Sequence, residues 1–465
     1  MGIFKAYDIR GVFGREIDAD VAFRVGRAFA AVSSGATVLV GYDARIHSAE
    51  LSRELVRGLV EGGRKVVGAG MTSTPALHFA QICRGEDAAV MVTASHNPAE
   101  YHGFKFFDAE GGTMSYRKGL DRIEEAYRRT ADAPLPPVTG GSCRDEQIHE
   151  PYLGFLADFA AGERFQQKIV VDASNGSAGG IFREMASRLN LDAEIVNAEP
   201  DGSFPAHPPN PLDTESRRVM AREVRDRRAD LGALLDGDGD RIIFVDEGGE
   251  ILEGYLSSAL MAEEILRKHP GAAVVHDLIS SRALPERITE LGGRPVISRV
   301  GYTFVYDQMV GSDAVFASET SGHFYFRVDH GKPTAAADSE RRAPFYTESA
   351  AYALVVMLRF LSRRGRSLSS LVGPLRRRYS QAPERNLRVA RKDAALDAVE
   401  SRFARGEISR LDGLSVSFPD FWFNLRPSNT EPLLRLRVEA VDAETAERRS
   451  GEIVELIGSE VGYED

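Results

Sequence analysis

Residues 88–98, Ala-Ala-Val-Met-Val-Thr-Ala-Ser-His-Asn-Pro, join an apolar stretch directly to a polar turn. The apolar part predicts a buried strand, and Asn97-Pro98 predicts the break that ends it. Upstream, residues 37–41 and 65–67 also predict strands, and apolar residues at helical spacing lie between them. This alternation predicts an α/β fold, in which helices pack on a largely parallel or mixed sheet.

The same rhythm begins again twice along the chain, near Lys168 and near Ala272. Residues 131–141 are rich in proline and glycine and predict a linker before the second unit. From about residue 369 the strands become close-set, which predicts a smaller α+β domain with an antiparallel sheet. A chain of 465 residues is too long for one core. We therefore expect three α/β units, candidates for one fold used three times, and then this C-terminal domain.

Composition excludes several classes of protein. No stretch approaches the roughly 20 uninterrupted apolar residues of a membrane helix, and the N-terminus has no apolar signal core. The two cysteines, Cys83 and Cys143, indicate no disulfide framework, so we expect a cytoplasmic protein. The formal net charge of −11 argues against nucleic-acid binding.

Three aspartates alternate with glycines in Asp236-Gly-Asp-Gly-Asp240, and Arg241 follows. In an extended chain alternate residues point to one face, so we expect the three carboxylates to converge. A hard divalent cation with oxygen ligands would compensate their repulsion. A solvated acidic turn is the plain alternative, but the apolar flanks indicate buried strands. An EF-hand is disfavoured because Arg241 stands where that loop needs glycine. The segment predicts a magnesium site.

Ser95 lies just past a predicted strand end, where a turn presents its hydroxyl. A turn with only internal side-chain bonds is the alternative. A serine-protease triad is disfavoured, because a histidine adjacent in sequence does not give triad geometry.

Three further segments carry polar side chains suited to phosphate or sugar. Residues 426–432, Arg-Pro-Ser-Asn-Thr-Glu-Pro, offer the donors that a phosphate dianion accepts, although a structural loop is equally consistent. Residues 319–323, Glu-Thr-Ser-Gly-His, offer sugar-binding groups and a titratable histidine. Residues 4–11 and Lys105 form charged segments that are not decisive by themselves.

Together and in this order, these segments resemble the α-D-phosphohexomutase family over essentially the whole chain. The resemblance implies three related α/β domains and a C-terminal domain around a central cleft. The boundaries that we expect are residues 1–150 for the domain with the phosphoserine loop and 151–252 for the one with the metal loop. Residues 253–368 are expected to carry the sugar-binding loop, and residues 369–465 the phosphate-binding domain.

The resemblance also implies roles for individual residues. Ser95 would carry the phosphoryl group and would ligate Mg²⁺ together with Asp236, Asp238 and Asp240. Arg241 would assist near the reacting groups, and Lys105 and His323 are the candidates for general acid–base catalysis. Other residues would lie near the phosphoserine (Tyr7, Arg10, His96), bind the sugar ring (Glu319, Ser321) or hold the distal phosphate (Arg426, Ser428, Asn429, Thr430).

The implied activity is the interconversion of hexose 1-phosphate and hexose 6-phosphate through a phosphoserine and a hexose 1,6-bisphosphate, which also acts as activator. The motifs at residues 4–11 and 426–432 resemble the phosphomannomutase/phosphoglucomutase branch, which favours mannose or glucose. Alternatives are a phosphoglucosamine mutase, an aspartate-nucleophile phosphatase that uses Asp236 and Asp238, and a sugar-phosphate-binding relative without turnover. We expect small-molecule sugar phosphates as partners, no membrane partner, and a monomer or small homo-oligomer.

The departures from the family pattern lie in the expected sugar-recognition domain. Ser318 replaces a glycine, Tyr302 stands where many bacterial members have histidine, and residues 278–281 lack a lysine. Residues 327–348 are longer and more polar than expected, and Glu348-Ser349 replaces an Asp-Gly pair. These changes leave the chemistry intact and leave the identity of the sugar open.

Overall fold

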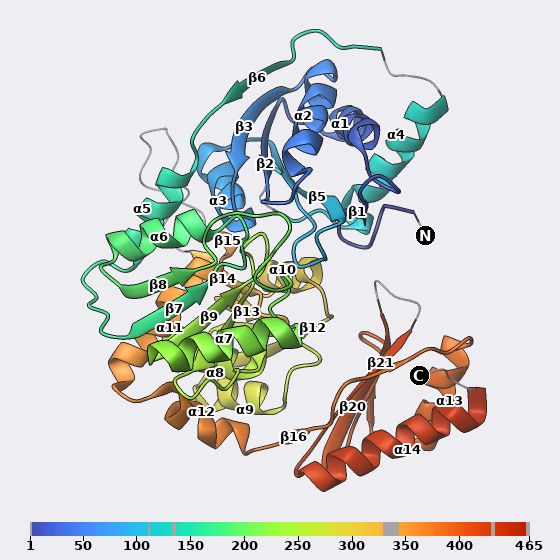
Figure 1. Cartoon of the computed structure of the whole chain (residues 1–465). Coiled ribbons are helices and arrows are strands. Elements are labelled where there is room, and N and C mark those ends of the chain that lie inside the picture. Colours follow the sequence, from blue (N-terminus) through green and yellow to red (C-terminus); the bar gives the residue numbers. More distant parts are fainter. Residues whose placement is uncertain (1, 110–111, 133–135, 329–343, 429–432, 462–465) are drawn as a thin grey trace.

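The computed structural model describes residues 2–109, 112–132, 136–328, 344–428 and 433–461. The described chain forms four sheets, one after another along the sequence. The first sheet (blue) lies at the top of Figure 1, and the second and third (green to orange) lie below it. The C-terminal sheet (red) lies to one side of them. This arrangement confirms the expected fold class of three α/β units and a C-terminal α+β unit.

The first unit contains two strand–helix repeats followed by two strands. Its elements are β2 (Thr37–Tyr42), α2 (Ser48–Glu61), β3 (Lys65–Met71), α3 (Thr74–Arg84), β4 (Ala88–Val92) and β5 (Tyr101–Phe107). The spatial order is β3-β2-β4-β5, in which the first three strands are parallel and β5 is antiparallel.

The second and third units repeat this topology. The second has β7 (Lys168–Asp172), α6 (Gly179–Arg188), β8 (Asp192–Val196), α7 (Thr214–Arg227), β9 (Leu231–Leu235) and β10 (Ile242–Asp246), in the order β8-β7-β9-β10. The third has β11 (Ala273–Asp277), α9 (Ala283–Glu290), β12 (Arg294–Ser298), α10 (Tyr302–Gly311), β13 (Phe316–Ser318) and β14 (Phe324–Val328), in the order β12-β11-β13-β14. In both, the fourth strand alone is antiparallel. One fold is therefore used three times.

Additional elements extend and cover these units. They are β1 (Ile9–Val12), α1 (Ala19–Val32), a 3-10 turn (Tyr116–Lys118), α4 (Leu120–Asp132), β6 (Ser142–Asp145), α5 (His149–Phe159), α8 (Gly254–Leu266), β15 (Phe345–Glu348), α11 (Ala350–Arg364) and α12 (Leu368–Arg376). β1 and β6 form the two edges of the first sheet, and β15 forms one edge of the third.

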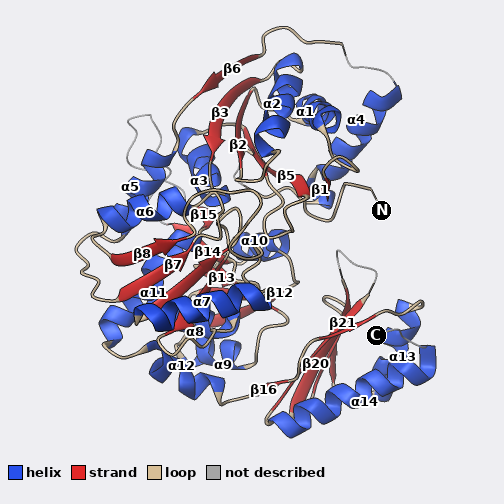
Figure 2. Cartoon of the chain, viewed as in Figure 1, coloured by secondary structure: helices blue, strands red, loops and turns tan. Residues whose placement is uncertain are grey.

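The C-terminal unit is an antiparallel sheet with helices on one face (Figure 2). Its strands are β16 (Ser380–Gln381), β17 (Arg385–Leu387), β18 (Glu407–Ser409), β19 (Leu414–Ser417), β20 (Phe421–Pro427) and β21 (Leu434–Ala440), and its helices are α13 (Lys392–Arg402) and α14 (Ala443–Val461). It has a hydrophobic core of its own, which includes Phe423, Leu436 and Ile453.

The largest hydrophobic core runs through the second and third units and also takes in α3 of the first. Capping residues define both ends of α3. The Ser73 hydroxyl accepts a hydrogen bond from the Ala76 amide at the N-terminus, and Gly85 ends the helix with a φ of 69°. Phe79 on this helix is buried, and its ring packs 5.4 Å from that of Tyr152 and 4.8 Å from that of Phe155, measured between centroids. The first unit is therefore joined to the next two by shared apolar packing.

We expect Phe79→Ala to lower the free energy of unfolding by about 3–5 kcal/mol, because it removes a buried ring and leaves a cavity at this junction. Phe79→Leu should cost less, since it retains most of the side-chain volume. Chemical denaturation of the two variants beside the parent chain measures the difference. An unchanged unfolding midpoint in Phe79→Ala would contradict the shared core.

Candidate active site

Three of the motifs singled out in the sequence occupy the same loop of the repeated unit, the one that joins its third and fourth strands. Ser95 lies between β4 and β5, the acidic segment between β9 and β10, and residues 319–323 between β13 and β14. Because the fold repeats, each motif follows the carboxyl end of a parallel strand, which is where α/β sheets place ligand-binding groups.

Ser95 is held in an uncommon backbone conformation. Its φ is 50°, in the left-handed region that a non-glycine residue rarely enters. The Ser95 amide donates to Thr93 Oγ1 at 2.9 Å, and the Ser95 hydroxyl donates to Asp236 Oδ2 at 2.8 Å. His96 Nδ1 lies 3.3 Å from the same hydroxyl oxygen. The turn therefore points the Ser95 hydroxyl at the acidic loop of the next unit.

The acidic segment is a tight turn and not the extended strand that we expected. Gly239 has a φ of 70°, and the amides of Asp240 and Arg241 fold back onto Asp236 Oδ1 at 3.1 and 3.2 Å. Gly237 is needed because a Cβ there would lie 2.8 Å from the carbonyl oxygen of Ser95. The carboxylates converge as predicted. The cause is the tight turn, however, and not the alternation of side chains along a strand.

Asp236, Asp238 and Asp240 offer oxygen atoms that all lie within 4.8 Å of one another, and the three side chains are buried. Burial raises the pKa of Asp236, and the charges of Asp240 and Asp238 raise it further. Asp238 Oδ1 and Asp240 Oδ1 are buried without a hydrogen-bond partner. A compact set of hard oxygen donors with unsatisfied atoms fits a magnesium ion.

Lys105 from β5 reaches the same carboxylates. Its Nζ lies 2.8 Å from Asp238 Oδ2 and 2.5 Å from Asp240 Oδ2. Burial alone would lower the pKa of Lys105, but the two charges raise it well above its usual value. Thr74, at the start of α3, also donates its hydroxyl to Asp238 Oδ2 at 2.6 Å. The first unit thus supplies a serine, a lysine and a threonine to the acidic loop of the second.

The loop of the third unit joins this cluster through His323. Arg241 Nε donates to His323 Nε2 at 2.9 Å, and His323 Nδ1 lies 3.3 Å from Glu348 Oε2. Glu319 is buried and accepts hydrogen bonds from the Gly301 amide at 3.0 Å and the Tyr325 hydroxyl at 2.9 Å. Ser321 lies two residues along the same loop and is half-buried. The structure therefore places Glu319, Ser321 and His323 on one loop beside Arg241.

Arg10 and Tyr7 come from the N-terminal segment, where Arg10 lies in β1 and Tyr7 just before it. Arg10 Nη1 donates to Asn97 Oδ1 at 2.7 Å, so its guanidinium braces the Ser95 turn. Tyr7 contacts the third unit: its hydroxyl donates to the Val300 carbonyl at 3.3 Å, and the Tyr302 hydroxyl donates to the Tyr7 carbonyl at 2.9 Å. Burial lowers the pKa of His96, and the charges of Arg241 and Arg10 lower it further, which favours a neutral ring.

The predicted phosphate loop is described only in part. Arg426 is buried at the end of β20, and the Ser428 amide donates to the Leu433 carbonyl at 2.9 Å. Asn429 and Thr430 lie outside the described residues. The sheet that carries Arg426 meets the third unit where Asp412 Oδ2 accepts the Val300 amide at 3.2 Å.

Sequence reasoning missed Arg45, which donates hydrogen bonds to the backbone of the Ser95 turn. This buried guanidinium donates to the carbonyls of Ser95 at 2.7 Å, Asn97 at 2.6 Å and Pro98 at 2.6 Å, and also to Asp43. A signal was available, because Asp43 and Arg45 directly follow a strongly apolar strand. Thr74 had no comparable signal, since its role depends on the packing of two units.

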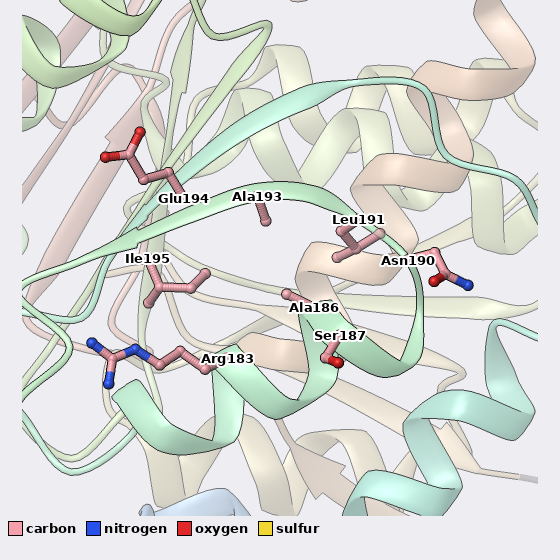
Figure 3. A pocket seen from close by; sticks show the side chains of 8 residues that line it. All are labelled: Arg183, Ala186, Ser187, Asn190, Leu191, Ala193, Glu194 and Ile195. Atoms are coloured by element: carbon pink, nitrogen blue, oxygen red, sulfur yellow. The ribbon is translucent and has the colours of Figure 1, made fainter.

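The described part of the chain has hollows on its surface. One of about 550 Å³ lies beside α6 and β8 (Figure 3), with Arg183, Leu191 and Ile195 in its lining, and it contains none of the residues above. Another, of about 440 Å³, includes Arg299, Asp412 and Pro427 and adjoins Arg426 in sequence. No helix in the described part of the chain is long and apolar enough to cross a membrane.

Comparisons with known proteins agree with this geometry. Models of the phosphoglucomutase/phosphomannomutase family match in chain order: alpha/beta/alpha domain I at residues 1–133, domain II at 150–249, domain III at 253–379, and the C-terminal domain at 384–456. A phosphomannomutase of Salmonella montevideo is 36% identical over 98% of this chain and 99% of its own. A phosphomannomutase of Methanocaldococcus jannaschii is 37% identical over 98% and 97%.

A solved structure of a phosphoglucomutase/phosphomannomutase family protein from Burkholderia thailandensis superposes with a TM-score of 0.85. It is 30% identical, and the match covers 99% of each chain. The family models and these relatives together cover nearly the whole chain, and the chain therefore belongs to the phosphoglucomutase/phosphomannomutase family of mutases, which are intramolecular phosphotransferases.

Proposed function

We propose that this enzyme interconverts hexose 1-phosphate and hexose 6-phosphate, with mannose or glucose as the sugar, through a phosphorylated Ser95 and a hexose 1,6-bisphosphate. The observation that carries the proposal is the 2.8 Å contact between the Ser95 hydroxyl and Asp236, inside a buried set of three carboxylates. The left-handed backbone of Ser95 also supports it. A non-glycine residue in this conformation costs free energy, and such residues cluster at active sites. Relatives named phosphomannomutase that cover the whole chain support the choice of sugar.

In the proposed cycle, the phosphoryl group leaves Ser95 Oγ for a free hydroxyl of a bound hexose monophosphate. The bisphosphate then reorients and transfers its other phosphoryl group to Ser95 Oγ, and the sugar oxygen that loses this group takes up a proton, which leaves the isomeric monophosphate. A phosphoserine carries about −1.5 to −2 charges, so it needs cationic neighbours. Arg10, Arg241 and Lys105 lie close enough to supply them.

Asp236, Asp238 and Asp240 are the residues that would hold Mg²⁺, with an oxygen of the phosphoserine as a further ligand. A bound Mg²⁺ supplies charge neutralisation for the transferring phosphoryl group. Two residues are placed to move the proton of the sugar hydroxyl, Lys105 and His323. Lys105 Nζ and His323 Nδ1 lie 2.5 and 3.9 Å from Asp240, and these two residues are the candidates for general acid–base catalysis.

Substrate binding would use residues 319–323 of the third unit and residues 426–430 of the C-terminal domain. Glu319 keeps its carboxylate fixed through Gly301 and Tyr325, and free lone pairs on it can accept sugar hydroxyls. Ser321 would add a second polar contact. Arg426 and Ser428, with Asn429 and Thr430, would hold the phosphate that is not reacting, because guanidinium and hydroxyl groups bind phosphate dianions.

A coupled assay tests the proposed function. Purified protein with Mg²⁺ and a trace of glucose 1,6-bisphosphate would receive mannose 1-phosphate, glucose 1-phosphate and glucosamine 1-phosphate in parallel. We expect turnover of the first two. Turnover of glucosamine 1-phosphate alone would indicate a phosphoglucosamine mutase, and release of inorganic phosphate without isomerisation would indicate a phosphatase.

We expect Ser95→Ala to lower kcat at least about 10³-fold while the chain stays folded, because no other group can take its place as phosphoryl carrier. Ser409→Ala, at an exposed site in the C-terminal sheet, is the matched control and should behave as the parent. Mutase assays and thermal melts of both variants check this. Parent-like turnover in Ser95→Ala would remove Ser95 from the mechanism.

We expect chelation of divalent cations to abolish turnover and added Mg²⁺ to restore it. Asp238→Asn should raise the Mg²⁺ concentration for half-maximal activity at least about tenfold, since the charge of the ligand set tunes affinity. Titrations of activity against Mg²⁺ measure this. Full activity in excess chelator would show that the acidic turn is not a metal site.

A further inference from the structure

Each copy of the repeated unit has a buried aspartate at the end of its first strand. Asp43 follows β2, Asp172 ends β7, and Asp277 ends β11, and their exposed fractions are 1%, 0% and 1%. The strand ladders show that these positions are equivalent. Tyr42 pairs with Val92, Asp172 with Leu234, and His276 with Ser318 in the third strand of the respective unit.

Extending the first and third of these ladders by one residue sets Asp43 opposite Thr93 and Asp277 opposite Glu319. Ser95, Asp236 and Ser321 then each lie two residues beyond the position opposite the aspartate. The three buried aspartates therefore stand in the same relation to the three functional loops.

Asp43 acts on the Ser95 turn through Arg45. Its carboxylate accepts from Arg45 Nε at 3.1 Å and from the Ser48 hydroxyl at 2.6 Å, which fixes the guanidinium. Arg45 Nη2 donates to the carbonyls of Ser95 and Asn97, at 2.7 and 2.6 Å, and Nη1 donates to the carbonyl of Pro98 at 2.6 Å. Asp43 supplies the negative charge in this contact set, so its loss would leave the buried guanidinium held by neutral carbonyls.

Asp172 acts on the acidic turn through Ser174. It accepts the Ser174 amide at 2.8 Å, and the Ser174 hydroxyl in turn donates to the carbonyl of Leu235 at 2.5 Å, directly before Asp236. It also accepts from Asn197 Nδ2 at 3.0 Å and lies 3.0 Å from His207 Nε2.

The two nitrogens of the His207 ring face acceptors, Asp172 and the Pro208 carbonyl, which favours the doubly protonated ring. Burial would lower the pKa of His207, but the hydrogen bond and charge of Asp172 leave it raised. His207 lies two residues before Pro209, whose Cβ would be 3.4 Å from a Cβ placed at Gly237 of the acidic turn.

Asp277 acts on the sugar loop directly. Its Oδ2 accepts the Thr320 amide at 2.7 Å, and its Oδ1 accepts the hydroxyls of Thr320 at 3.0 Å and Ser280 at 2.6 Å. Thr320 lies between Glu319 and Ser321, so this carboxylate fixes the backbone of both predicted sugar contacts.

A buried carboxylate loses a large hydration energy, and it persists only where several donors satisfy it. Charge-assisted hydrogen bonds of this kind are short and directional, so they hold a loop more firmly than neutral ones. We propose that Asp43, Asp172 and Asp277 are equivalent positioning residues, each of which sets the geometry of one functional loop. This inference rests on the proposed function for the task of each loop: phosphoryl carriage by Ser95, magnesium binding by the acidic turn, and sugar binding by residues 319–323.

The inference predicts separable effects, which the full chain can test with Asp43→Asn, Asp172→Asn and Asp277→Asn. Three measurements are made on each variant: the rate of Ser95 phosphorylation at saturating Mg²⁺ and glucose 1,6-bisphosphate, followed by intact mass, the Mg²⁺ dissociation constant from calorimetry, and the dissociation constant of mannose 6-phosphate. We expect Asp43→Asn to slow phosphorylation, Asp172→Asn to weaken Mg²⁺ binding, and Asp277→Asn to weaken sugar-phosphate binding. Each should change its own readout about tenfold or more and the other two by less than about threefold.

Asp246 offers a matched control. It is a buried aspartate of the same fold, at 1% exposure, but it accepts the amides of Gly248 and Glu250 in the turn after β10. Asp246→Asn should lower the thermal melting temperature and leave all three readouts unchanged. The inference is overturned if the three variants lose all readouts together in proportion to their loss of melting temperature.

A second set of variants tests the inference where an Asn variant does not fold. Arg45→Lys, Ser174→Ala and Thr320→Val each remove one link between an aspartate and its loop, and each should reproduce the selective loss of the corresponding Asn variant. Parent-like values in all three would overturn the inference. The binding measurements need no turnover. If the parent chain had no mutase activity but its variants still showed these selective losses, only the proposed function would be overturned.

Discussion

Three carboxylates buried within 4.8 Å of one another are the constraint on which the structure around the site depends. Such a cluster cannot stay ionised without positive charge and hydrogen-bond donors close by. The first unit supplies Lys105 and the Ser95 hydroxyl, and the neighbouring Arg241 links the cluster to His323 of the third. The electrostatic requirement of one loop thereby fixes how three units meet.

The repeated fold explains why these groups can meet at all. Each unit ends its third strand with a loop at the same place, and the three copies turn these loops toward a common region. The chemistry then differs only in the loop residues: a hydroxyl, a set of carboxylates, or a glutamate with a histidine. Because these functional residues lie in three equivalent loops, most residues of the strands and helices need only satisfy packing.

The sequence predicted the fold class and the site motifs because both depend on local signals. Apolar strands such as residues 88–92 and the spacing of Asp236, Asp238 and Asp240 are visible in the chain itself. The turn that brings the aspartates together was not predicted, since its shape depends on Gly239 and on amides that fold back onto Asp236. Arg45 and Thr74 were missed because their partners lie about 50 and 164 residues away and only tertiary packing makes the contact. The domain boundaries and the roles of single residues stay predictions.

The arrangement of the hydrophobic cores divides the molecule into parts of unequal cooperativity. The second and third units and α3 share one continuous core, whereas the rest of the first unit and the C-terminal sheet have cores of their own. Polar contacts such as Asp412 with the Val300 amide and Glu439 with the Arg282 amide lie at its border with the third unit. Such contacts exchange readily with water, while apolar packing does not. Thermal energy can therefore shift or locally melt the C-terminal sheet while the junction between the Ser95 turn and the acidic turn stays assembled.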